Sequence, residues 1–267
     1  MFGLIEWTEQ RQRGDPEVRE RQILRLRFWG ASILRRQGTP QALLRRRCRR
    51  AARQLQRLGV TRAVFPEDFP YTAEFARWGI RPVDPLPMYR ALSGELVQAA
   101  LEDRGPDRQG TLVAVCADRL TAEVRQAVTA LCIRNRYVLL SAPDREGAFC
   151  RQLRREYGVP LVQTTDPAQL GRAGVVVLFS PRPGDFRGQT VLELYQGGTL
   201  PAYRLTLEGG EALPGGCDRP QLLGSLWTAG AIRPGQVAVS REKRREGAPS
   251  PPPAEKSGLH PRGAGKK

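Results

Sequence analysis

Blocks of apolar residues alternate with amphipathic blocks along residues 111–182, in the lengths of strands and helices. The segments 112–116, 137–140 and 175–179 are apolar without alternation, which is typical of strands covered by helices on both faces. Between them, Thr121 is a candidate N-cap for a helix with a stripe of Val124, Ala127, Val128 and Leu131. A second helix over 146–157, a short strand at 160–162 and a short helix over 166–171 complete the pattern. Alternating elements of these lengths predict a parallel sheet with right-handed crossovers.

The flanking regions follow other patterns. Residues 3–7 and 22–29 are predicted to form an antiparallel pair of strands, and residues 40–58 a helix that ends at Gly59. Further elements are expected at 61–65, 71–78, 80–83 and 87–103, in the order strand, helix, strand, helix. Beyond residue 182, strands at 190–195 and 200–208 are predicted to form an antiparallel hairpin or meander, because a Gly-Gly pair separates them. A helix over 220–229 and a strand over 236–239 follow.

The predicted fold class is therefore α/β: a Rossmann-like parallel sheet flanked by helices, with an antiparallel N-terminal hairpin and a C-terminal meander. We divide the chain into an N-terminal β-hairpin region (1–38), an α/β subdomain (39–104) and a Rossmann-like unit with its meander and closing helix (111–240). Residues 241–267 are basic, rich in proline and nearly free of apolar residues, so we expect them to be disordered.

The layout of residues 111–182 resembles the cofactor-binding domain of the shikimate dehydrogenase and glutamyl-tRNA reductase type. In that type, too, a strand like 175–179 ends in a small residue followed by proline, here Ser180-Pro181. Where the family carries a glycine-rich phosphate turn, this chain has no glycine over residues 116–121. Glycines let backbone N–H groups approach a pyrophosphate at the helix N-terminus. We therefore expect a Rossmann-like scaffold whose ligand is lost or changed, with cofactor and ligand unknown.

Candidate ligand residues lie where the predicted parallel strands end, because ligands bind beyond the carboxyl ends of such strands. These residues are Asp118, Arg119, Ser180 and Arg182. Asp118 would repel a phosphate, whereas Arg119 would attract one. Asp144 and Arg145 follow the second strand, where an acidic residue orders the ribose in dinucleotide-binding domains.

A second set of acidic residues, Glu67, Asp68 and Asp84, follows the strands of the preceding region. If both halves share one sheet or face a common cleft, these carboxylates and Asp118 converge and are able to hold a divalent metal or act as general bases. The alternative is that they solvate loops.

Histidine and cysteine usage narrows the chemistry. The only histidine, His260, lies in the predicted tail, which removes Ser-His-Asp and Cys-His catalysis and most zinc sites. The cysteines number five with no Cys-x-x-Cys pair, and Cys116, Cys132 and Cys150 fall on apolar faces. This usage is typical of reduced core thiols in a cytoplasmic protein. No apolar run approaches the ~20 residues of a membrane span, and the N-terminus lacks a signal-peptide pattern.

The net charge of +16 is concentrated at the two ends of the chain. Residues 1–62 contain 16 arginines and 5 acidic residues, residues 241–267 contain 8 basic and 3 acidic residues, and residues 63–240 contain 19 of each sign. The most basic helix, 40–58, is consistent with contact to nucleic acid or an anionic membrane surface, or with a solvated outer face. A coding preference for arginine is a further interpretation, since basic residues comprise 39 Arg and 4 Lys.

Three functional hypotheses follow. The first is non-catalytic binding of a nucleotide-like small ligand or a protein partner. The second is an atypical NAD(P)-dependent oxidoreductase in which Arg119 or Arg145 anchors a phosphate. The third is nucleic-acid association through the basic ends, which predicts an affinity that falls steeply with salt.

Overall fold

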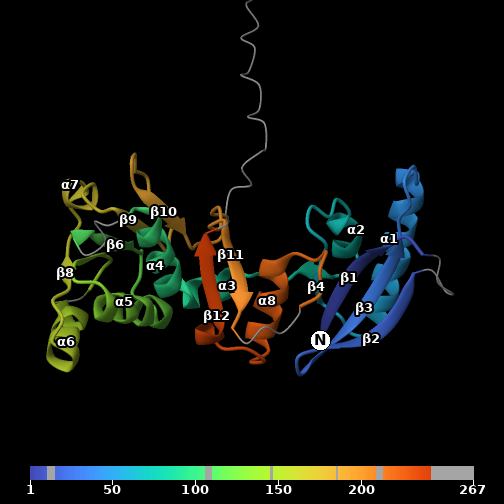
Figure 1. The fold of residues 1–267 in the computed structure, drawn as a ribbon, viewed down its shortest axis with the longest axis horizontal. Helices are drawn as coiled ribbons and strands as arrows, with labels where there is room; N and C mark the ends of the chain where they lie inside the picture. The colour runs from blue at the N-terminus through green and yellow to red at the C-terminus, as the bar shows by residue number, and fades with distance from the viewer. Residues whose placement is uncertain (11–15, 106–109, 145–146, 185, 209–212, 242–267) are drawn as a thin grey trace, which may run out of the picture.

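The computed structural model describes residues 1–10, 16–105, 110–144, 147–184, 186–208 and 213–241. Figure 1 shows two sheets toward opposite ends of this part of the chain, with α3 (Leu86–Ala91) and α8 (Arg219–Thr228) between them. Each of these sheets has five strands, and a further sheet has two. Of the predicted tail, the structure describes only Arg241; His260 lies outside the described residues.

The first sheet contains the strands nearest the N-terminus in the order β2-β3-β1-β4-β5. Their bounds are β1 (Phe2–Thr8), β2 (Glu17–Ile23), β3 (Leu26–Leu34), β4 (Arg62–Val64) and β5 (Arg81–Pro82). Because β1 pairs in parallel with β3 and β4, the predicted antiparallel pairing of residues 3–7 with 22–29 is wrong. The N-terminal hairpin is formed instead by β2 and β3. β2 escaped prediction because four of its seven residues are exposed and polar, as an edge strand tolerates.

α1 (Gln41–Arg57) and α2 (Thr72–Ala76) pack on one face of this sheet and share a core with it. The buried residues of α1 are Leu44, Cys48, Ala51, Ala52 and Leu55. The predicted helix over 40–58 is therefore confirmed, although Leu58 follows the helix and is exposed. Gly59, with a φ of +75°, ends the helix in the left-handed conformation that glycine favours.

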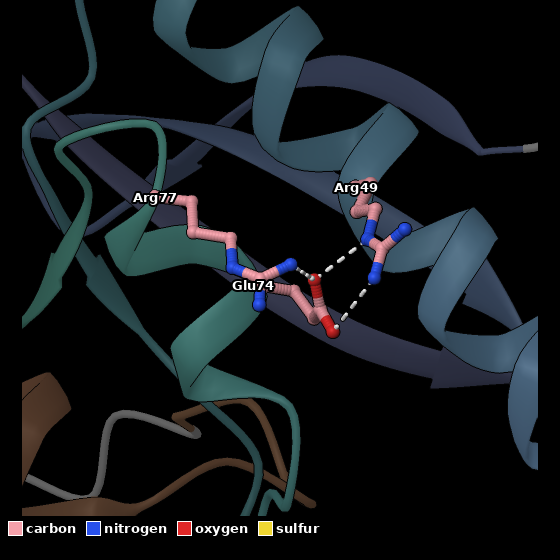
Figure 2. A network of polar contacts seen from close by, with 3 residues as sticks. All are labelled: Arg49, Glu74 and Arg77. Carbon is pink, nitrogen blue, oxygen red and sulfur yellow. Dashed lines mark hydrogen bonds and ion pairs between the residues drawn. The ribbon is translucent and has the colours of Figure 1, made fainter.

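A buried acidic residue joins the two helices. The carboxylate of Glu74 in α2 accepts a hydrogen bond from Nε of Arg49 in α1 at 2.7 Å and pairs with Nη1 of Arg77 at 3.3 Å (Figure 2). The hydrogen bond from Arg49 lowers the pKa of Glu74; burial opposes this effect, and the charges of Arg49, Arg77 and Arg45 add to it. Glu74 is therefore held as a carboxylate at the contact between α1 and α2.

The predicted helix over 87–103 is divided in two. α3 ends at Ala91 and α4 (Ser93–Asp103) begins two residues later, so that Leu92 lies between them. The break is next to Ser93-Gly94, and Ser/Gly pairs are common sites of helix kinks. The residues of this region that face the core are buried and include Tyr89, Leu92, Leu96, Val97 and Ala100.

The second sheet is entirely parallel and has the order β10-β9-β6-β7-β8. Its strands are β6 (Val113–Cys116), β7 (Val138–Ser141), β8 (Val162–Gln163), β9 (Val175–Leu178) and β10 (Thr190–Glu193). Every residue of β6, β7 and β9 is buried, as their non-alternating apolar pattern predicts. The Rossmann-like sheet is confirmed. Because β10 pairs in parallel with β9, and β11 pairs with β12, the antiparallel pairing predicted between residues 190–195 and 200–208 is wrong.

The crossover helices begin and end as the sequence indicates. They are α5 (Ala122–Arg134), α6 (Ala148–Tyr157) and α7 (Pro167–Leu170). The hydroxyl of Thr121 accepts a hydrogen bond from the backbone N–H of Val124 at 3.3 Å and caps α5. The carboxylate of Asp166 caps α7 in the same way, and Gly158 follows α6 with a φ of +68°.

The C-terminal part of the described chain returns to the first sheet. β11 (Tyr203–Leu207) and β12 (Val237–Arg241) form the antiparallel pair. At the start of α8, the backbone N–H of Asp218 donates to the carbonyl of Phe65 at 2.8 Å, and Oε1 of Gln221 accepts from the N–H of Phe65 at 3.0 Å. One apolar core, which includes Val64, Val115 and Leu222, runs from the first sheet to the second.

None of the helices in the described ranges combines the length and the apolar character that crossing a bilayer requires. All five cysteines are described and free, and four of them are buried.

Candidate ligand site at the carboxyl ends of β6 and β9

A pocket of about 350 Å³ lies where β6 and β9 end. The strand order of the second sheet reverses between these neighbours, because the chain runs from β6 to β7 on one side and from β9 to β10 on the other. In open parallel sheets, this switch point is where ligands bind. The pocket is lined by Arg90, Ala117, Asp118, Arg119, Thr121, Glu123, Val124, Phe179 and Ser180.

The turn from β6 into α5 forms one wall of the pocket. None of residues 117–121 has a positive φ, so this turn does not adopt the conformation that requires glycine. The N-terminus of α5 faces the pocket through Thr121 and Val124. Thr121 already satisfies the N–H of Val124, while the partial positive charge of this 13-residue helix favours an anion.

Two arginines line the pocket, and they differ in exposure and in ion pairing. Arg90 of α3 is half-buried; its Nε donates to the carbonyl of Leu194 at 2.8 Å, and its Nη1 donates to the carboxylate of Glu123 at 3.1 Å. Arg119 is exposed and has no ion pair with another described residue. Arg119 is therefore the cation of the pocket that is free to meet an anionic ligand.

Arg182 lies elsewhere. Its Nη1 donates to the hydroxyl of Ser141, the last residue of β7, at 2.5 Å. Its guanidinium is also close enough to the thiol of Cys116, at the end of β6, to affect the pKa of that thiol. Burial raises the pKa of Cys116, and the charge of Arg182 partly opposes this rise. Arg182 thus spans the ends of β6 and β7 and is not part of the pocket lining, whereas Asp118, Arg119 and Ser180 are.

Asp144 is engaged in helix capping. Its carboxylate accepts hydrogen bonds from the backbone N–H groups of Phe149 at 3.1 Å and of Cys150 at 3.2 Å, in the first turn of α6. In dinucleotide-binding domains, the acidic residue near this place binds the ribose. Here the carboxylate of Asp144 is already hydrogen-bonded to the backbone of α6. Arg145 lies outside the described residues.

The three acidic residues of the first half follow strands of a different sheet. Glu67 and Asp68 are exposed after β4, and Oδ1 of Asp84 accepts from the N–H of Leu86 at 3.0 Å to begin α3. Within the ranges that the structure describes, no three His, Cys, Asp or Glu side chains form a group able to hold a metal ion. Glu67, Asp68, Asp84 and Asp118 are thus not brought together as a metal site.

Sequence reasoning missed Arg90, although this residue lines the pocket. The available signal was an arginine directly after the inward-facing Tyr89 in a largely apolar helix. A half-buried arginine needs a hydrogen-bond acceptor. Here the acceptor is the carbonyl of Leu194, more than 100 positions later in the chain.

No protein-family model and no curated protein matches this sequence. Among solved structures, it is similar to phosphoglycerate oxidoreductase from Vibrio cholerae, with 11% identity over 74% of this chain and 78% of that chain and a TM-score of 0.30. L-tryptophan dehydrogenase from Nostoc punctiforme has 17% identity and a TM-score of 0.29, and the match covers 57% of this chain but only 44% of the dehydrogenase. D-lactate dehydrogenase from Lactobacillus jensenii has 10% identity, a TM-score of 0.23, and coverage of 57% and 49%. At these values the similarities carry no argument about activity; the chain is an α/β protein with a Rossmann-like sheet.

Proposed function

We propose that this Rossmann-like protein binds a small nucleotide-like anion in the pocket at the ends of β6 and β9, and that it does so without catalysing a reaction. The observation that carries the proposal is the position of Arg119, an uncommitted cation beside the N-terminus of α5 in a pocket at the switch point.

The volume of the pocket and the side chains at the end of β7 favour a small ligand over an extended dinucleotide. The pocket volume of about 350 Å³ is near the lower end of the range for ligand pockets. A dinucleotide would have to continue over the end of β7, where Arg182 binds Ser141 and Asp144 caps α6. The side chains lining the pocket include neither histidine nor cysteine, and of the two carboxylates there, Glu123 is paired with Arg90.

The experiment is a calorimetric titration with inorganic phosphate, AMP and NAD⁺, preceded by native mass spectrometry to detect a co-purified ligand. Arg119→Gln should weaken the binding of AMP by about 10- to 100-fold, because a charge-assisted hydrogen bond is lost. Arg172→Gln is the matched control, since Arg172 is exposed and does not line the pocket.

The same titration extended to NADP⁺, together with an absorbance assay of reduced nicotinamide, distinguishes the alternative of an NAD(P)-dependent oxidoreductase. That alternative predicts that NAD⁺ or NADP⁺ binds more tightly than AMP and that a reduced nicotinamide is consumed. Equal affinities of the wild-type protein and Arg119→Gln for every probe would overturn our assignment of the site.

A further inference from the structure

The outer face of α1 carries a row of arginines that no other described residue neutralises. Arg46, Arg50, Arg53 and Arg57 follow one another at spacings of four, three and four residues and are all exposed. At 100° per residue, they point directly away from the buried stripe of Leu44, Cys48, Ala51 and Leu55. The row is about 16 Å long, because an α-helix rises about 1.5 Å per residue.

The arginines of this face lack acidic partners, whereas arginines of the adjacent sheet have them. In the β2–β3 hairpin, Arg19 pairs with Glu17, and Arg27 pairs with Glu20; Arg21 pairs with Glu6 of β1. α1 contains no acidic residue, and the row forms no ion pair or hydrogen bond with another residue of the described chain. The nearby carboxylate of Glu74 is already bound by Arg49 and Arg77 (Figure 2).

We infer that this face of α1 is a docking surface for the phosphate backbone of double-stranded DNA. Charge complementarity identifies a polyanion, since unneutralised arginines side by side repel one another until an anion lies between them. The diameter of a helix with its side chains, about 10–12 Å, matches the width of the major groove of B-form DNA, about 12 Å. The groove of A-form RNA is too narrow for a helix.

Two other partners fit this face less well. A helix that lies on a membrane inserts its apolar face, but the apolar face of α1 is buried against the first sheet. Single-stranded nucleic acid is held largely by stacking of bases on aromatic side chains, and α1 contains no aromatic residue. This inference does not depend on the pocket at β6 and β9.

The test uses the full chain and fluorescence anisotropy with a short labelled DNA duplex. The variant is the combination Arg46→Gln, Arg50→Gln, Arg53→Gln and Arg57→Gln, because glutamine retains helix propensity. The matched control removes the same charge from exposed positions elsewhere: Arg154→Gln, Arg155→Gln, Arg172→Gln and Arg204→Gln. Circular dichroism verifies that both variants remain folded.

We expect the wild-type affinity to fall by at least about 100-fold between 50 and 200 mM salt, as four phosphate contacts predict. The plot of log affinity against log salt has a negative slope, and the α1 variant should make it shallower by about 3.6. The control should change this slope little. Equal losses in the two variants would show that only net charge matters and would overturn the inference. Tighter binding to single strands, to duplex RNA or to anionic phosphatidylserine vesicles than to duplex DNA would also overturn it.

Discussion

Arg182, which follows β9, donates a hydrogen bond to the hydroxyl of Ser141 at the end of β7, at a distance of 2.5 Å. The side chain therefore crosses the end of β6, where its charge opposes the rise in the pKa of Cys116 that burial causes. In a Rossmann-like sheet, this is the route that a dinucleotide follows from the switch point toward its ribose-binding residue. Here the contact between Arg182 and Ser141 lies on this route, whereas the pocket lies beside β9.

The contact between Arg182 and Ser141 should stabilise the fold. Arg182→Met and Ser141→Ala should each lower the free energy of unfolding by about 1.5–3 kcal/mol, the usual range for a hydrogen bond that involves a charged group. The double variant should lose less than the sum of the two, because the side chains interact directly. Urea denaturation measures all four proteins; strictly additive losses would contradict the contact.

Asp144 should act on stability through the first turn of α6. Asp144→Ala should lower the free energy of unfolding by about 1 kcal/mol, because the N–H groups of Phe149 and Cys150 lose their acceptor. Asp144→Asn retains an acceptor oxygen and should lose less. If AMP binding weakened in Asp144→Ala while stability did not change, Asp144 would be a ligand residue and not a cap.

Glu74 should contribute to stability in a pH-dependent way. Its pKa is lowered in the folded protein, mainly by the hydrogen bond from Arg49. The contribution is therefore complete above the unfolded-state pKa of glutamate, about 4.3, and is lost as the pH falls through the lower folded-state pKa. The difference in unfolding free energy between the wild-type protein and Glu74→Gln should be constant above about pH 6 and should shrink below about pH 4. A difference that does not vary with pH would contradict this assignment.

Gly224 should be required where α8 packs against the loop before α3. A Cβ atom at this position would lie 3.1 Å from Cα of Pro85, which is backbone and cannot move aside. Gly224→Ala should therefore destabilise the protein by about 1–3 kcal/mol, although alanine favours helices. Gly215→Ala is the control, because a Cβ atom there meets nothing within 4 Å. Thermal unfolding of the two variants should separate them clearly.

The parts of the fold that the sequence predicts well are those that burial alone determines. β6, β7 and β9 are apolar at each position except Ser141, because helices cover both faces. The capping residues Thr121 and Asp166 mark helix starts locally. Strand pairing is harder to predict, because contacts between residues distant in sequence determine which strands pair. The glycines after residue 196 suggested a hairpin, but Leu192 and Leu194 are buried in the core with β9 and α4, so β10 extends the parallel sheet.

The candidate site was predictable to a similar extent. The rule that ligands bind at the ends of parallel strands located Asp118, Arg119 and Ser180, which line the pocket. The rule gives positions but not side-chain directions, so it could not tell that Arg182 turns toward Ser141. Arg90 comes from a helix of the preceding region, and its approach depends on how that region packs against the second sheet.

The most direct test of the proposed binding site is a titration of the isotope-labelled protein with AMP, followed by the backbone amide signals in NMR spectra. Binding at the switch point predicts that the signals of residues 118–124, in the turn after β6 and the first turn of α5, shift first and saturably. In Arg119→Gln, the same shifts should require about 10- to 100-fold more AMP. Shifts confined to α1 or to the end of β7, or none at all, would contradict the site at the ends of β6 and β9.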